Sequence, residues 1–127
     1  MKKIYSILTI LTLALLSACS GSDTYRGNWK ATDSNGTQFD LNFEAKTFSV
    51  KNQLDEITTH GYTQNSININ NSIETYGIKL DDGRSCQINF PIADDESKGI
   101  ITDGSGIVIY TISRTDYINY NDLNSLH

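Results

Sequence analysis

The chain has 127 residues, the size of a single domain, and its 10 Lys and Arg against 15 Asp and Glu give a formal net charge of −5. A nucleic-acid-binding protein needs a basic face, so this balance argues against that class. One Pro and nine Gly are not typical of a disordered chain, and two Cys cannot build a disulfide scaffold.

The N-terminus has the pattern of a secretory signal. Lys2 and Lys3 form a short basic segment, and residues 4–16 follow without a charged side chain. An apolar segment of this length is too short to span a bilayer and fits the central region of a signal peptide. The sequence therefore predicts export from the cytoplasm.

The next residues are Leu16-Ser17-Ala18-Cys19. This sequence resembles the lipobox of bacterial lipoproteins, which implies cleavage before Cys19 and attachment of diacylglycerol to the Cys19 thiol. Several acyl chains on one residue give a stable membrane anchor, which a single chain does not. The alternative is an ordinary secretory signal in which Cys19 has no special role.

These signals divide the chain into a signal peptide (1–18), a lipidated Cys with a short tether (19–24), a β domain (25–115) and a polar C-terminal tail (116–127). Once Lys2 and Lys3 are removed with the signal, 8 basic residues face 15 acidic ones, a net charge of −7. Ser20 after the Cys, in place of Asp, resembles proteobacterial lipoproteins sorted to the outer membrane. We therefore expect a protein of the cell envelope, in the outer membrane of a Gram-negative host or the plasma membrane of a host without one.

The body of the chain alternates between apolar and polar residues, which predicts β-strands with one face in the core. No stretch after Cys19 has good helical periodicity, and the tail is expected to be loose or to form one helical turn. The alternating apolar positions, expected to face inward, are Phe39, Leu41, Phe43, Phe48, Val50, Ile67, Ile69, Tyr76, Ile78, Leu80, Cys86, Ile88 and Phe90.

Turn residues separate these runs. Asn35-Gly36 predicts a type I′ hairpin, and Asp81-Asp82-Gly83 and 103–106 mark two more turns. Short strands joined by tight turns predict an all-β fold, an antiparallel meander of about eight strands, closed as a small barrel or folded as a sandwich.

A further resemblance rests on Gly27-Asn28-Trp29 in the first strand and Arg114 at the end of the last. A Gly-x-Trp with a late Arg resembles the calycin signature of lipocalins and fatty-acid-binding proteins, and implies that Arg114 packs across the Trp29 indole and closes one end of a barrel. A guanidinium stacks well on an indole and can bond nearby carbonyls. Both residues would then be structural plug residues and not ligand contacts. The chain is shorter than typical lipocalins and lacks their disulfides and the helix before the last strand.

Residues suited to catalysis are few, and we predict no enzyme, no catalytic residue, no metal site and no cofactor. His60 and His127 stand without a motif that would make either a catalytic base. Cys86 alternates with apolar residues, as a small core residue would. The acidic groups Asp81-Asp82 and 94–96 lack the spacing of a calcium loop and are candidates for contact with a basic protein.

Three functions remain open for a lipid-anchored binding protein of this kind. One is capture of a small apolar ligand inside an open barrel lined by residues such as Phe39, Leu41, Ile67 and Ile69. Another is an inhibitor or immunity protein that blocks a basic enzyme or toxin acting on the envelope. The last is a structural envelope lipoprotein. The volume of the barrel cavity is the feature that separates the first from the others.

Overall fold

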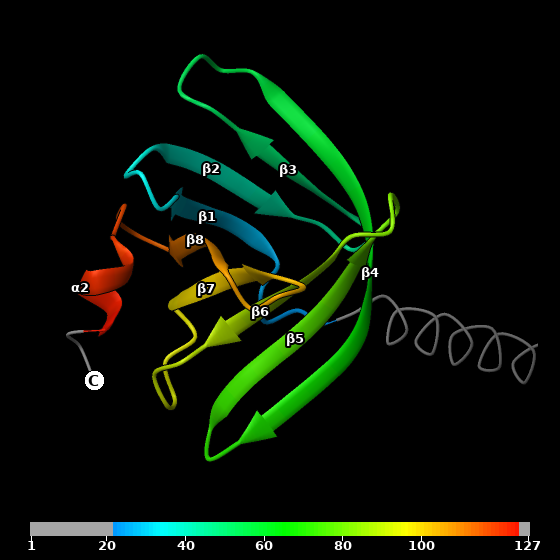
Figure 1. The fold of residues 1–127 in the computed structure, drawn as a ribbon, viewed down its shortest axis with the longest axis vertical. Coiled ribbons are helices and arrows are strands. Elements are labelled where there is room, and N and C mark those ends of the chain that lie inside the picture. The colour runs from blue at the N-terminus through cyan, green and yellow to red at the C-terminus, as the bar shows by residue number, and fades with distance from the viewer. Residues whose placement is uncertain (1–21, 125–127) are drawn as a thin grey trace, which may run out of the picture.

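The computed structural model describes residues 22–124 and has an all-β architecture (Figure 1). Each strand pairs antiparallel with the next, and β1 pairs with β8, so the sheet closes into a barrel. This confirms the predicted meander and selects the barrel over the sandwich. The strands are β1 (Gly27–Thr32), β2 (Gln38–Phe43), β3 (Thr47–Lys51), β4 (Ile57–Asn70), β5 (Ile73–Leu80), β6 (Ser85–Phe90), β7 (Lys98–Asp103) and β8 (Val108–Ser113).

Alternation along the strands decides which side chains fill the barrel. In β2, Leu41 and Phe43 are buried and Phe39 packs against the same core, while Gln38 and Asp40 are exposed. Ring contacts between Phe43, Phe48 and Tyr62 continue this core from strand to strand. The interior is thus filled largely by aromatic and branched side chains, as in other small barrels.

Successive turns of a meander lie at opposite ends of the barrel, so the fold has two distinct ends. We call the end with the β1–β2, β3–β4, β5–β6 and β7–β8 turns the open end. The other, which we call the closed end, holds the β2–β3, β4–β5 and β6–β7 connections and the N-terminal segment 22–26.

The β1–β2 turn is not the type I′ turn that Asn35-Gly36 predicts. Only Gly36 in this pair has a positive φ, of 83°, and Gly36 donates its N–H to the Asp33 carbonyl. The Asp33 carboxylate accepts the N–H groups of Asn35 and Thr37 at 2.9 Å, which favours a three-residue loop with a glycine bulge. The turn at the tip of β4–β5 has two consecutive positive φ values, 54° at Asn71 and 63° at Ser72.

Strand β4 differs most from the prediction, because it begins at Ile57 and runs past the barrel as a hairpin with β5 (Figure 1). Ile67 and Ile69 lie on this projecting part and are 53% and 59% exposed. The expectation that they line the barrel interior is therefore wrong. Their alternation was read correctly, because both share the face of Tyr76, but they lie where the hairpin leaves the barrel and are exposed to solvent.

The C-terminal segment folds back onto the outside of the barrel. Its only regular element in the described part is α2 (Tyr120–Asn124), in which Leu123 is buried. Before it, the Tyr117 hydroxyl donates to Asp40 and the Lys30 ammonium lies 4.8 Å from the Tyr117 ring centroid. The segment is thus held by contacts with β1 and β2, and of the two expected outcomes, a loose tail or one helical turn, it has the helical turn.

Candidate functional site

The closed end holds the two residues singled out by the calycin resemblance. Trp29 is buried, and the Arg114 guanidinium carbon lies 3.6 Å from its ring centroid. Arg114 also donates to the carbonyls of Thr24 at 3.1 Å, Arg26 at 2.7 Å and Asn28 at 2.9 Å. Burial lowers the pKa of the Arg114 side chain, but a guanidinium remains charged. Arg114 thereby links the end of β8 to the chain that enters β1.

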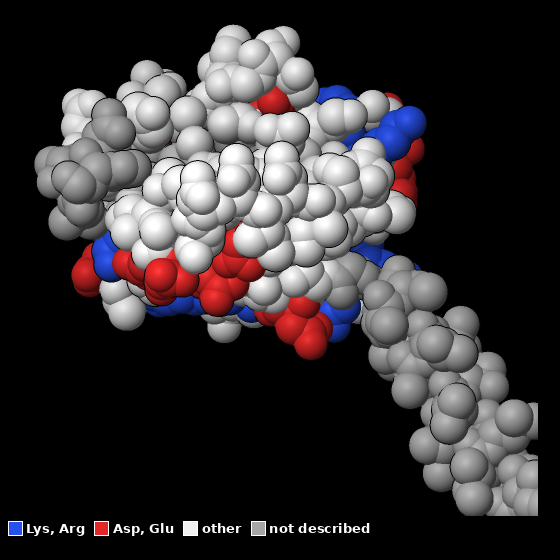
Figure 2. Space-filling view, turned by 90° about the horizontal axis from the view of Figure 1, so that it is seen from below, with Lys and Arg blue, Asp and Glu red and all other residues white. Residues whose placement is uncertain are grey.

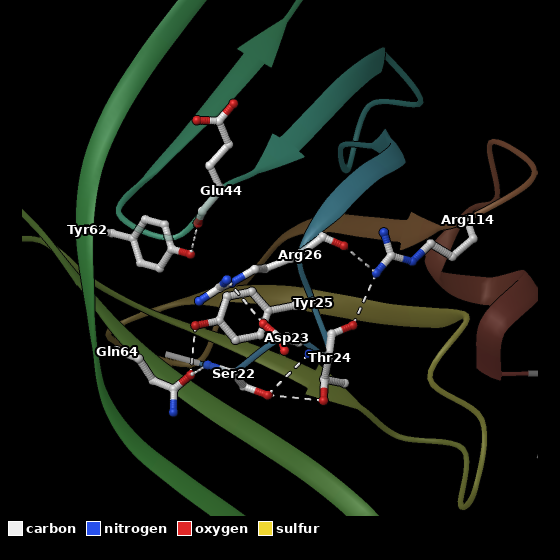
Figure 3. Close-up of polar contacts among 9 residues, drawn as sticks. All are labelled: Ser22, Asp23, Thr24, Tyr25, Arg26, Glu44, Tyr62, Gln64 and Arg114. Carbon is white, nitrogen blue, oxygen red and sulfur yellow. Dashed lines mark hydrogen bonds and ion pairs between the residues drawn. The ribbon is translucent and has the colours of Figure 1, made fainter. Parts of the chain in front are cut away.

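Tyr25 fills the closed end, a role that the sequence did not suggest. It precedes β1 and is fully buried among Phe43, Tyr62 and Tyr76. Its hydroxyl donates to Gln64 at 2.7 Å, as Figure 3 shows. Burial raises the pKa of Tyr25 well above its ordinary range, so its hydroxyl stays protonated in the core.

The barrel interior keeps a small cavity of about 110 Å³ toward the open end. Its lining includes side chains from four strands and one turn, among them Phe48, His60, Arg84, Cys86 and Tyr110. Typical small-molecule sites have volumes of roughly 300–1,000 Å³. The space is therefore too small for a fatty acid or another ligand of ordinary cofactor size.

Cys86 and His60 both line this cavity. Cys86 is a free, half-buried thiol, and burial raises its pKa, which disfavours the reactive thiolate. The His60 ring lies 5.1 Å from the Phe48 ring, and Phe48 also packs on the core. Both residues therefore have packing contacts that explain their positions.

The turns at the open end expose apolar side chains. Leu54 in the β3–β4 turn is 80% exposed and Ile107 in the β7–β8 turn is 65% exposed. A polar side chain stabilises each turn: Asn52 accepts a hydrogen bond from the Leu54 N–H, and Asp103 accepts one from the Ile107 N–H. Two large apolar side chains are thus presented to solvent on well-defined turns.

A groove of about 610 Å³ lies beside this end, between the β1–β2 turn and α2. Its walls are mostly polar and include Asn35, Asn119, Tyr120 and Asn121. Tyr120 is partly exposed there. The groove therefore adjoins the β1–β2 turn at the open end.

The two acidic groups of the sequence lie at opposite ends of β6. Asp82 is at the open end, where its carboxylate accepts a hydrogen bond of 2.8 Å from Arg84 Nε, and this interaction lowers the Asp82 pKa. Asp95 is at the closed end, where hydrogen bonds from Ser97 lower its pKa. Next to it, a hydrogen bond with Glu74 raises the pKa of Glu96.

Cys19 and His127 lie outside the described residues. Within residues 22–124, no helix is long and apolar enough to cross a membrane. In the same part of the chain, no three His, Cys, Asp or Glu side chains form a group that could hold a metal ion.

The open-end surface could not be found from the sequence by motif, because Leu54 and Ile107 come from turns more than fifty residues apart. The one available signal was the position of each residue beside turn-forming residues, Asn52 for Leu54 and Gly106 for Ile107. Closure of the barrel places both at one end.

Comparisons with protein-family models, with curated proteins and with solved structures gave no match. The class of protein is therefore defined by the fold: a small closed barrel of eight antiparallel strands with a plugged end and an open end.

Proposed function

We propose that this protein is a lipid-anchored, non-enzymatic binding protein of the cell envelope, whose calycin-like barrel recognises a protein partner at its open end. The anchor is the acyl-modified Cys19, and the calycin character rests on Gly27-Asn28-Trp29 together with the stacked Arg114. No nucleic acid and no cofactor are expected to take part.

The observation that carries this proposal is the small interior cavity of about 110 Å³. A lipocalin-like carrier of lipids needs an interior several times larger. Capture of a small apolar ligand in the barrel is therefore the weaker candidate, and recognition falls to the outer surface.

The open end has the chemistry of a partner surface. Leu54 and Ile107 supply exposed apolar side chains, and Asp55, which pairs with Lys51, lies next to Leu54 in the same turn. Exposed apolar side chains with charged residues near them are the usual components of a protein interface. The acidic net charge favours a basic partner, as an inhibitor or immunity protein against a basic envelope-targeting enzyme or toxin would have.

The direction of the chain supports this orientation. The described chain begins at Ser22 on the closed end, where the Ser22 N–H donates to Gln64 at 2.9 Å. An anchor attached through this segment keeps the closed end toward the membrane and leaves the open end available.

The test is to isolate the anchored protein from its own envelope and identify co-purifying proteins and lipids by mass spectrometry. Association with a protein recovered in this way is then measured for Asp81→Asn/Asp82→Asn, and for Asp94→Asn/Glu96→Gln as the closed-end control. We expect only the open-end pair to slow association, and salt to weaken the difference because it screens exposed charges.

Two results would contradict the proposal. Recovery of a stoichiometric lipid or small molecule without a protein would favour the interior. An equal loss of association in both pairs of variants would place the partner elsewhere on the barrel.

A further inference from the structure

The hairpin formed by β4 and β5 projects from the closed end and exposes two isoleucines. Ile67 pairs with Tyr76 and Ile69 pairs with Glu74 across the hairpin. Cross-strand partners share one face of a sheet, and Tyr76 points into the barrel core, so both isoleucines lie on the inner face of the hairpin. The strand register shifts between Gln64 and Ser66, and this irregularity places them on that face.

The hairpin is free of charge along most of its length. Residues 57–73 contain no Asp, Glu, Lys or Arg. Seen from the hairpin side, the molecule presents a broad uncharged surface, with acidic side chains gathered along one edge (Figure 2). The Asp94 N–H contacts the Ser72 carbonyl at 3.4 Å, so the acidic 94–96 loop adjoins the hairpin tip.

The chain leading to the anchor is attached to the root of this hairpin. The Ser22 N–H and the Tyr25 hydroxyl both donate to the Gln64 side chain (Figure 3). The Tyr76 hydroxyl donates to Thr24 at 3.2 Å. Segment 22–25 therefore runs beside the face that carries Ile67 and Ile69.

The length of chain before Ser22 fixes how far the lipid can be. Cys19 is three residues from Ser22, and a fully extended chain spans at most about 3.6 Å per residue, or roughly 11 Å here. Ile67 is also three residues from Gln64, along a strand that rises about 3.3 Å per residue. The two isoleucines are thus within reach of the same lipid surface as the acylated Cys19.

We propose that the inner face of the β4–β5 hairpin, through Ile67 and Ile69, docks into the headgroup region of the membrane that holds the anchor. This proposal rests on the acyl anchor of the proposed function. The occupant is a zwitterionic phospholipid surface, because Glu74, Asp94 and Glu96 beside the isoleucines offer no attraction to anionic lipid. Docking adds a second contact to the anchor and fixes the barrel with its open end directed away from the bilayer.

The test uses the full acylated protein reconstituted into phosphatidylcholine vesicles. In a Cys86→Ser background, a fluorescent label is attached either at Ile69→Cys on the hairpin or at Ile107→Cys at the open end. Both native isoleucines are largely exposed, so the two sites are a matched pair. Lipids brominated near the headgroup report the depth of each label, and the intact mass reports acylation of Cys19.

We expect the label at position 69 to be quenched several-fold more strongly than the label at position 107. Equal quenching at both positions in protein that carries its acyl chains would overturn the docking and leave the anchor standing. Energy transfer between labels at position 69 without quenching would also overturn it, and would place a second copy on the hairpin. Protein that lacks acyl chains on Cys19 would overturn both the anchor and the docking.

Discussion

Arg114 links the end of β8 to the segment before β1, and its removal tests how the barrel is held closed. Its guanidinium covers Trp29 and donates to three backbone carbonyls of segment 24–28. A guanidinium–indole contact contributes about 0.5–2 kcal/mol, and hydrogen bonds from a charged donor contribute about 1.5–3 kcal/mol when fully protected from water. Arg114 is only half-buried, so water restores part of the loss. We expect Arg114→Ala to lower the free energy of unfolding by about 2–3 kcal/mol, a large share of a small domain's stability.

Urea unfolding followed by Trp fluorescence measures this loss directly, because Trp29 is the single Trp of the chain. The native emission of Arg114→Ala should also shift to longer wavelength as the indole face becomes exposed. Arg114→Lys keeps the charge but has no planar fork of donors, so its unfolding midpoint should lie between those of the wild type and Arg114→Ala. Arg84→Ala is the control, since Arg84 pairs with Asp82 on the exposed surface. An Arg114→Ala protein with the midpoint and emission of the Arg84→Ala control would refute the closing role of Arg114.

Three further predictions follow from particular contacts. Gly99→Ala should destabilise the barrel by about 1–3 kcal/mol in urea unfolding, because its Cβ would lie 2.6 Å from the Asn89 carbonyl, whereas Gly104→Ala, with its nearest neighbour at 3.7 Å, should be neutral. Burial raises the pKa values of Tyr25 and Tyr62, so the folded state holds these protons more tightly than the unfolded chain does. The free energy of unfolding should therefore fall as the pH rises above about 10, and the fall should be smaller in Tyr25→Phe. Unfolding midpoints between about pH 8 and 11 measure this. Metabolic labelling with palmitate should mark the wild-type protein and not Cys19→Ser, and equal labelling of both would reject lipidation at Cys19.

Local sequence patterns were sufficient for most strands of the barrel. Alternation in β2 identified Leu41 and Phe43 as core residues, because a strand with one buried face has a period of two and no other constraint. Turn residues located the hairpins, although the type of the β1–β2 turn depended on the Asp33 side chain and was not evident from Asn35-Gly36. The Arg114 contact with Trp29 matches what the calycin resemblance implies.

The remaining features depend on how distant segments meet. Alternation cannot show where a strand leaves the barrel, so Ile67 and Ile69 were assigned to the correct face but to the wrong environment. Tyr25 lies outside any strand, and it is buried only because the sheet closes into a barrel around its side chain. The open-end surface likewise combines turns that are far apart in sequence.

The position of the N-terminal segment connects the fold to the proposed function. Tyr25 is buried in the core, and Arg114 binds the carbonyls of Thr24, Arg26 and Asn28. The segment from Thr24 onward is therefore a fixed part of the barrel, and only a few residues separate it from Cys19. Under the proposed function, with the lipid on Cys19, so short a connection would restrict rotation of the domain relative to the membrane far more than a long flexible linker would. The contacts that close one end of the barrel would then also determine which end the proposed partner can reach.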